Sequence, residues 1–274
     1  MMKIKDFLSK LFDWYLHASI HVALATSALV CMTFYFSKLP FDCNVLILVF
    51  SGTVFAYNFI KYYSVIQKKG FFTKALKGIG ILSALSALSA AFCFINLKFQ
   101  AQCVVLFFLS LCILYVIPVS KTGQNLRNWA GIKIYIVSLC WSGATLLIPL
   151  FNANAVMTSD VVFKFLQRFI LTLILILIFE INDLKFDDPA LKTVPQSIGV
   201  AKTKRLIYLL LLPFFVLELF KIGVQLPQVI INFILVLVIA AFTYFLHDKR
   251  SAYYTLFWVE SIPILWLILV LLEG

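Results

Sequence analysis

The chain has 274 residues, of which 63% are hydrophobic and 13% are charged, and it carries a formal net charge of +11. Soluble domains average about 45–50% apolar and about 25% charged residues, so this composition excludes a soluble globular protein and predicts an integral membrane protein. The positive charges gather between apolar runs, which is typical of membrane topology and argues against nucleic-acid binding.

Nine apolar runs follow one another along the chain, and a transmembrane helix needs about 20 mostly apolar residues. No polar stretch between them has the length of a soluble domain, so a single transmembrane domain over residues 1–274 is predicted. The expected fold class is therefore all-α, a nine-transmembrane-helix bundle. The predicted spans are Trp14–Phe36, Cys43–Val65, Leu76–Leu97, Gln102–Val119, Trp129–Phe151, Val161–Asp183, Arg205–Gly223, Pro227–Leu246 and Tyr253–Leu272.

The Lys and Arg residues are distributed unevenly over the connections, and most of them share a side with the N-terminus. Because cytoplasmic loops carry an excess of Lys and Arg, this asymmetry predicts a cytoplasmic N-terminus and a C-terminus outside. We expect the chain in the plasma (inner) membrane, in contact with its lipids. The long polar connections after the second, fourth and sixth spans then face the cytoplasm.

The end of the second span carries Asn58, Lys61 and Tyr62 at positions i, i+3 and i+4, on one helical face. An amide, an ammonium and a phenol on one face predict a site for an anion such as a diphosphate. For Tyr62 the alternative is an aromatic side chain that anchors the helix at the membrane interface. Asn58 lies deeper in the span, where an amide needs a polar partner.

The connection after the fourth span begins at Tyr115 and places Lys121 and Arg127 on either side of a polar turn. Phosphate oxygens favour both groups, Lys as a point charge and Arg as a planar fork. Diphosphate contacts are therefore predicted here. Positive-inside topology by itself also explains these charges, and the sequence leaves both interpretations open.

A cluster of acidic residues follows the apolar part of the sixth span. If the helix continues through Asp187, then Glu180, Asp183 and Asp187 lie at i, i+3 and i+7 on one face. Mg²⁺ prefers oxygen ligands and is often held by carboxylates together with substrate phosphates, so all three are candidate magnesium ligands. The alternative is a helix end that runs into a solvated loop. Lys192 follows in a turn before the seventh span.

Three further ionisable residues lie inside apolar spans. Glu260 is either part of a functional site or a neutral, hydrogen-bonded acid between helices. His17 and His21 have the helical spacing of metal ligands, but no third ligand on the same helix accompanies them. For His21 we expect an interior histidine whose ring nitrogens both have partners.

The motif Asp183-x-x-x-Asp187, followed by Lys192-Thr193 and Gly199, resembles the second Asp-rich motif and the downstream turn of the UbiA superfamily of intramembrane prenyltransferases. Span number, orientation and loop order extend the resemblance over nearly the whole chain. It implies transfer of an isoprenoid chain from a prenyl diphosphate to a lipophilic or aromatic acceptor, as in quinone and lipid biosynthesis, with Mg²⁺ as the cofactor.

The resemblance also implies roles for individual residues. Tyr115 with Lys121, leading into Arg127, resembles the tyrosine–basic segment after the family's fourth helix, with a longer spacing. Asp183 and Asp187, with Glu180 beside them, then hold the magnesium–diphosphate. The basic residues Lys121, Arg127 and Lys192 neutralise the leaving group, and Asn58, Lys61, Tyr62 and Tyr115 contact the diphosphate.

The chain departs from the family at the first Asp-rich motif, Asn-x-x-x-Asp-x-x-x-Asp on the second helix. Asn58 matches its first position, but Tyr62 and Ile66 replace the two acids. Lys61 is the candidate to supply part of the missing positive charge. The departure leaves open a non-catalytic protein that binds isoprenoid or quinone-type lipids, and a transporter is a third, weaker alternative.

Overall fold

The computed structural model describes residues 2–69, 74–117, 131–188, 191–247 and 250–273, and all regular structure within these ranges is helical. Helices dominate because lipid offers no partners for backbone N–H and C=O groups, which a helix satisfies internally. The elements are α1 (Met2–His17), α2 (Ile20–Phe36), α3 (Cys43–Lys69), α4 (Lys74–Ile95), α5 (Phe99–Val116), α6 (Ile132–Ser142), the π-helical turn η2 (Gly143–Leu147), α7 (Ile148–Asn152), α8 (Ser159–Asp183), α9 (Val194–Ile198), α10 (Val200–Leu219), α11 (Leu226–Phe245), the π-helical turn η4 (Tyr254–Val259) and α12 (Ile262–Glu273).

The predicted all-α transmembrane bundle is confirmed, but the count of nine spans is not. Among the described residues, seven helices are long and apolar enough to cross a membrane, and α1 with α2 gives an eighth if the bent pair is one span. The predicted seventh span corresponds to α10, whose 20 residues include Lys202, Lys204, Arg205 and Glu218. With these four charges, α10 is not among the seven apolar candidates.

The first predicted span is broken into two helices. Between α1 and α2 the chain bends by 56°, and Ser19 adopts a left-handed backbone conformation with φ of 61°. The prediction of one continuous helix over Trp14–Phe36 is therefore wrong at this point. A break of this kind frees backbone carbonyls at the end of α1, and these need partners inside the bundle.

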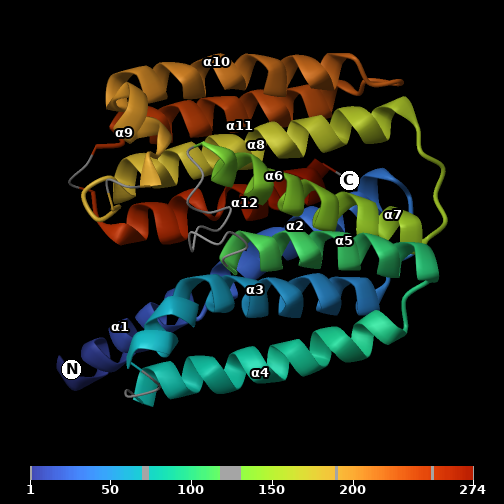
Figure 1. Ribbon diagram of the computed structural model, residues 1–274. Helices are drawn as coiled ribbons and strands as arrows, with labels where there is room; N and C mark the ends of the chain where they lie inside the picture. Colours follow the sequence, from blue (N-terminus) through green and yellow to red (C-terminus); the bar gives the residue numbers. More distant parts are fainter. Residues whose placement is uncertain (1, 70–73, 118–130, 189–190, 248–249, 274) are drawn as a thin grey trace.

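The long helices lie side by side in one bundle, with α10 and α11 along one edge and α4 along the other (Figure 1). α8 packs against α6 and α10, while α2 packs against α3 and α12. Leu171, Ile174 and Ile178 of α8 are fully buried, and their spacing places them on one helical face. Gly143 marks a close contact, since a Cβ atom there would lie 1.7 Å from Cζ of Phe108. The core therefore fixes α8 relative to its neighbours.

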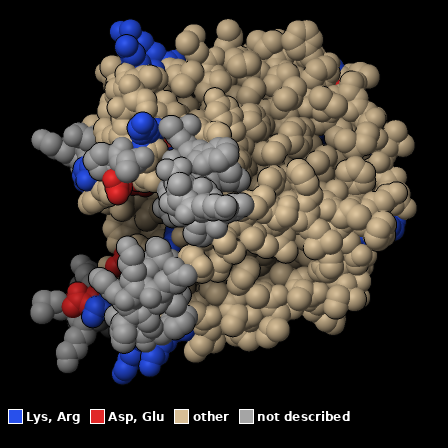
Figure 2. Space-filling view, viewed as in Figure 1, with Lys and Arg blue, Asp and Glu red and all other residues tan. Residues whose placement is uncertain are grey.

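The two ends of α8 define the two ends of the bundle. We call them the Asp183 end, which carries Glu180, Asp183 and Asp187, and the Arg168 end, which carries Lys164 and Arg168. On the face shown in Figure 2, most of the visible charged atoms gather near the Asp183 end, and the broad middle of the face is uncharged. Large apolar side chains such as Phe92, Leu209 and Leu237 are exposed, as helices that face lipid require.

Candidate functional site

The polar face of α3 meets the break between α1 and α2. The Asn58 amide donates hydrogen bonds to the Ala18 carbonyl at 3.1 Å and to the Ser83 hydroxyl of α4 at 3.0 Å. Tyr62 donates from its hydroxyl to the His17 carbonyl at 3.0 Å. Lys61 donates to the Ser19 hydroxyl at 3.1 Å. The spacing expected from the sequence thus brings the three side chains together on one face of α3.

The acceptors of Asn58 and Tyr62 explain why these two side chains point toward the helix break. The bend leaves the carbonyls of His17 and Ala18 without helical donors, and a buried carbonyl without a partner is costly. Two side chains of α3 supply the missing donors. Asn58 is 2% exposed, and its Oδ1 has no hydrogen-bond partner. The amide therefore stabilises the helix break, and its donors are directed at the Ala18 carbonyl within the break and at α4, not at the acidic residues of α8.

At the Asp183 end, Glu180 is engaged by protein groups. Its carboxylate forms an ion pair of 2.9 Å with Lys133 of α6 and accepts a hydrogen bond of 3.0 Å from the backbone N–H of Val194. Glu180 is 4% exposed. This pair joins α6 and α8 to the first residue of α9.

Asp183 ends α8, so the helix does not continue through Asp187. In the turn that follows, the backbone N–H groups of Phe186 and Asp187 donate to the Asp183 carbonyl at 2.8 and 3.0 Å. The turn still keeps the carboxylates of Asp183 and Asp187 within electrostatic reach of each other, with Lys133 and Lys185 nearby. Both acids are half-buried. Together with Glu180, however, they do not form a three-ligand metal group among the described residues.

The start of α9 contacts the backbone of the turn that carries Asp187 and Asp188. Thr193 and Gln196 form a reciprocal capping box at the start of α9, and the Gln196 amide donates to the Asp187 and Asp188 carbonyls at 3.4 and 3.3 Å. Such a cap satisfies two backbone N–H groups at a helix start. Lys192 is exposed directly before this cap, with a φ of 46°. Figure 2 shows a hollow in the surface near this end of the bundle.

The predicted basic segment after the fourth span is only partly described. Tyr115 is buried at the end of α5 and lies within electrostatic reach of Tyr57. Lys121 and Arg127 lie outside the described residues.

A polar cluster inside the bundle connects to this end. Trp141 of α6 donates from its Nε1 to the Tyr57 hydroxyl at 2.7 Å. Glu260 interacts electrostatically with both Tyr57 and Lys61 of α3. Its backbone N–H donates to the Thr255 carbonyl, one turn earlier. Thr255 in turn accepts a hydrogen bond from Asn182, the neighbour of Asp183, at 3.2 Å.

Sequence reasoning selected Glu260 and Lys61 but did not pair them, and it missed Tyr57, Trp141 and the role of Lys133. The helices that carry them are far apart in the chain. An ionisable residue inside a membrane span tends to pair with one of opposite charge. This rule could have predicted the pairing of Glu260 with Lys61.

His21 is an interior histidine with partners at both ring nitrogens, as expected. Its Nε2 lies 3.0 Å from the Phe257 carbonyl, which can only accept, so Nε2 carries the proton. Nδ1 then accepts a hydrogen bond of 2.7 Å from the Tyr15 hydroxyl. These contacts join α1, α2 and η4 around the helix break.

Comparisons with known proteins identify the fold. No protein-family model matches the sequence, and no curated protein matches it. The structure resembles a UbiA homolog from Archaeoglobus fulgidus bound to GPP and Mg²⁺, with a TM-score of 0.64, 13% identity, and coverage of 94% of this chain and 98% of that chain. It also resembles the apo structure of a UbiA homolog from Aeropyrum pernix K1, with a TM-score of 0.67, 12% identity, and coverage of 93% and 98%.

A second Archaeoglobus fulgidus structure, bound to DMAPP and Mg²⁺, matches with a TM-score of 0.63 at 13% identity, over 94% of this chain and 98% of that chain. The chain therefore has the fold of these UbiA homologs over nearly its whole length. The resemblance inferred from the Asp-rich motif is confirmed at the level of the fold.

Proposed function

We propose that this chain is an intramembrane prenyltransferase that binds a prenyl diphosphate at the Asp183 end and transfers its isoprenoid chain to a lipophilic or aromatic acceptor. The fold supports the proposal, since homologs of the same fold bind GPP or DMAPP together with Mg²⁺. The observation that carries it to this chain is the pair Asp183 and Asp187, which lie within electrostatic reach of each other and of Lys133 and Lys185.

The residues present fit a magnesium ion. Asp183 and Asp187 offer carboxylate oxygens from a half-buried turn, and Mg²⁺ is commonly held by one or two carboxylates, with phosphate oxygens and water completing its shell. Glu180 is committed to Lys133 and Val194, so we assign it to positioning. Bound Mg²⁺ would offset the negative charge of the diphosphate as it departs.

Basic residues near the Asp183 end are proposed to stabilise the leaving diphosphate. Charge develops on the diphosphate as its bond to the isoprenoid carbon breaks, and fixed positive groups around it stabilise that charge. Lys133 is held by Glu180, and Lys192 is exposed beside the α9 cap. Lys121 and Arg127 complete the proposed basic lining. Lys61 stays a proposed contact of the diphosphate, with Glu260 within its electrostatic reach.

In this proposal the bundle has nine spans: the seven apolar helices, α10, and the bent α1–α2 pair counted as one span. The basic connections face the cytoplasm, so the Asp183 end opens toward the cytoplasmic side of the plasma (inner) membrane. Soluble prenyl diphosphate then reaches the site from the cytoplasm, and the lipophilic acceptor reaches it from the bilayer.

The test is prenyl transfer in membranes containing the full chain, with labelled geranyl, farnesyl and longer diphosphates and a membrane lipid extract as the acceptor source. We expect Asp183→Asn/Asp187→Asn to lower transfer by about 100-fold or more, because the charge that balances Mg²⁺ is lost. Asp188→Asn, an exposed acid next to the pair, is the matched control and is expected to retain activity. Equal activity of the double variant and wild type would refute the assignment.

A second candidate function is binding of the same ligands without transfer. It is favoured by one observation: the polar side chains of α3 brace the helix break, and Tyr62 stands at a position where the family's first motif has an acid. Magnesium-dependent binding of prenyl diphosphate by wild type, without product from any acceptor, would select this function.

A further inference from the structure

The first helix, α1, has two unlike faces. Asp6 and Lys10, one turn apart, share a charged face. Phe7 and Leu11, also one turn apart, lie on another side of the helix with Leu8 beside them, and we call these three residues the free face of α1. A charged face combined with an apolar face is typical of helices that lie in the plane of a membrane interface.

The free face of α1 is exposed, although the helix itself is held in place. Its three side chains are 65%, 56% and 51% exposed, in chain order. On a different side of the helix, the Phe12 ring centroid lies 5.2 Å from that of Phe257, and the Tyr253 hydroxyl donates to Asp13. Contacts with η4 and the residue before it therefore fix α1 and leave the free face uncovered by them. A contiguous exposed apolar surface marks a site for a partner or a membrane.

α1 lies at the Asp183 end of the bundle. Its partner Tyr253 is two residues before Thr255, which accepts a hydrogen bond of 3.2 Å from Asn182, the neighbour of Asp183. The axes of α1 and α2 differ by 56°, so α1 runs obliquely to the span instead of continuing it. Figure 1 shows the N-terminal end of α1 projecting at the same end of the bundle as α9.

α2 crosses most of a bilayer without help from α1. Its 17 residues extend about 25 Å at 1.5 Å per residue, and the hydrocarbon core is about 30 Å thick. Only about the last turn of α1 is then needed to complete the span. Trp14 and Tyr15 lie in this turn, and Trp and Tyr gather at membrane interfaces. The earlier turns of α1, including the free face, are left at the membrane surface.

Exposed cations lie close to α1. The helix contains three Lys and two Asp residues, and Lys10 is exposed. Lys74 and Lys77 are exposed in the first turn of α4, and this part of α4 lies against α1, since a Cβ atom at Gly78 would be 3.6 Å from Nε1 of Trp14. Figure 2 shows Lys and Arg side chains gathered at this end of the molecule. Cations beside an apolar surface match anionic headgroups above their acyl chains.

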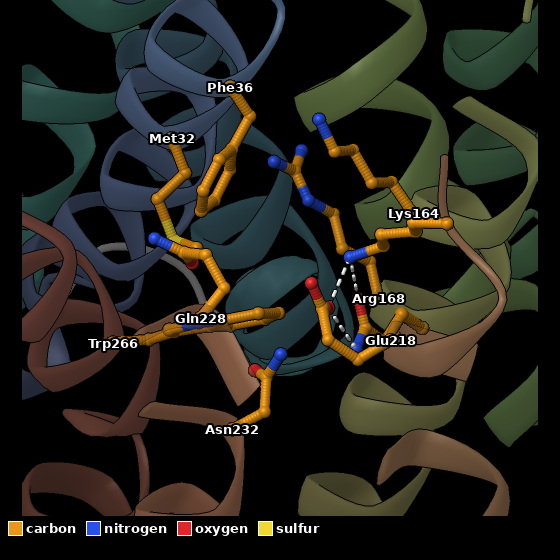
Figure 3. Close-up of a pocket in the computed structure, with 10 residues that line it drawn as sticks. Met32, Phe36, Lys164, Arg168, Glu218, Gln228, Asn232 and Trp266 are labelled. Carbon is orange, nitrogen blue, oxygen red and sulfur yellow. Dashed lines mark hydrogen bonds and ion pairs between the residues drawn. The ribbon is translucent and has the colours of Figure 1, made fainter. Parts of the chain in front are cut away.

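Cations at the Arg168 end are engaged inside the protein instead (Figure 3). Lys221 pairs with Glu218, and Lys164 lies within electrostatic reach of the same carboxylate. Arg168 is 3% exposed and donates to the Thr145 carbonyl at 2.8 Å. These three cations line a small pocket between α2, α8, α10, α11 and α12. The exposed cations next to α1 are better placed to meet lipid headgroups.

From these observations we propose that α1 is an interfacial anchor that binds the surface of a bilayer containing anionic phospholipid. The free face inserts among the acyl chains at the headgroup boundary, and Lys10 with the first turn of α4 contacts the lipid phosphates. Asn58 and Tyr62 hold the other end of α1 at the helix break. The helix is thus fixed by the bundle at its C-terminal end and by lipid along its first turns.

The test uses the full chain in lipid nanodiscs with one copy per disc, so that a second copy cannot cover the free face. Leu11→Cys reports on the free face, and Asp6→Cys, also exposed, is the matched site on the charged face. A membrane-impermeant maleimide labels each variant, and peptide mass spectrometry separates the new cysteine from the native ones. Each rate is divided by the rate of the same variant unfolded in SDS.

In discs of mixed phosphatidylcholine and phosphatidylglycerol, we expect Leu11→Cys to be labelled at least about tenfold more slowly than Asp6→Cys, because lipid covers its face. Adding Lys10→Gln should speed labelling of Leu11→Cys about fivefold, since each Lys near an anionic surface contributes about that factor to binding. Discs of phosphatidylcholine alone should have a similar effect. Lys98→Gln, at an exposed cation before α5, is the matched control and should change nothing.

Equal labelling of Leu11→Cys and Asp6→Cys in the anionic discs would place both faces of α1 in water and overturn the proposal. Protection of both sites would place α1 inside the hydrocarbon or the bundle, which also contradicts it. Protection of Leu11→Cys that persists in phosphatidylcholine and with Lys10→Gln would exclude the anionic headgroup as the partner. None of these readouts uses prenyl transfer, so the result is independent of the proposed function.

Discussion

At the scale of single residues, the pair Lys133 and Glu180 fixes the acidic end of α8. The side chain of Lys133 is 16% exposed and that of Glu180 is 4% exposed. Removal of one partner from a buried pair leaves an uncompensated charge, which is far more destabilising than loss of both. The pair therefore joins α6 to α8 and keeps Lys133 within electrostatic reach of Asp183.

We predict that Lys133→Met lowers the stability of the protein by about 3 kcal/mol, because Glu180 is left buried and unpaired. Adding Glu180→Gln should restore most of that loss, since the buried charge is then removed. Thermal unfolding in detergent measures both, with Lys77→Met on the exposed side of α4 as the control. Additive losses in the double variant would show that the two side chains do not act as a pair.

At the scale of elements, the break between α1 and α2 organises much of the interior. Asn58 and Tyr62 of α3 supply donors to its carbonyls, and His21 links it to η4 through Phe257. The resemblance implied that this face of α3 contacts Mg²⁺ and diphosphate. In the structure it supports the break between α1 and α2 instead. This arrangement gives Asn58 a structural role that requires neither acid of the first motif.

Asn58→Ala is accordingly expected to destabilise the fold by about 1–3 kcal/mol, because the Ala18 carbonyl loses its donor in a buried setting. Prenyl diphosphate binding by the folded variant should stay within about twofold of wild type, since the amide is not directed at α8. Thermal unfolding and ligand binding, measured on the same preparation, test both parts. Asn96→Ala serves as a control, because the Asn96 amide donates within its own exposed helix end. Loss of binding at unchanged stability would instead place Asn58 in the site.

At the scale of the whole molecule, the apolar runs predicted the helices well because each long run must form a helix in lipid. The spacing of Asn58, Lys61 and Tyr62 also predicted a shared face. Their partners were not predictable, because the break at Ser19 has no proline or glycine to mark it. The pocket around Arg168 was missed for a related reason: its residues come from five helices and show no local motif.

The fold separates the charged residues of α8 into two groups. α8 spans the bundle, with the acids Asp183 and Asp187 at one end and the cations Lys164 and Arg168 at the other. The apolar core around Ile174 separates the proposed magnesium–diphosphate site from these cations. Variants at Lys164 should therefore leave ligand binding at the Asp183 end unchanged.

The central claim is that Asp183 and Asp187 form the magnesium-dependent diphosphate site, and equilibrium binding of labelled geranyl diphosphate to the purified full chain tests it most directly. We predict saturable binding to wild type that disappears when Mg²⁺ is chelated, and at least about tenfold weaker binding to Asp183→Asn/Asp187→Asn at any Mg²⁺ concentration. Asp188→Asn should bind as wild type does. Binding that is unaffected by chelation and by the double substitution would contradict the account.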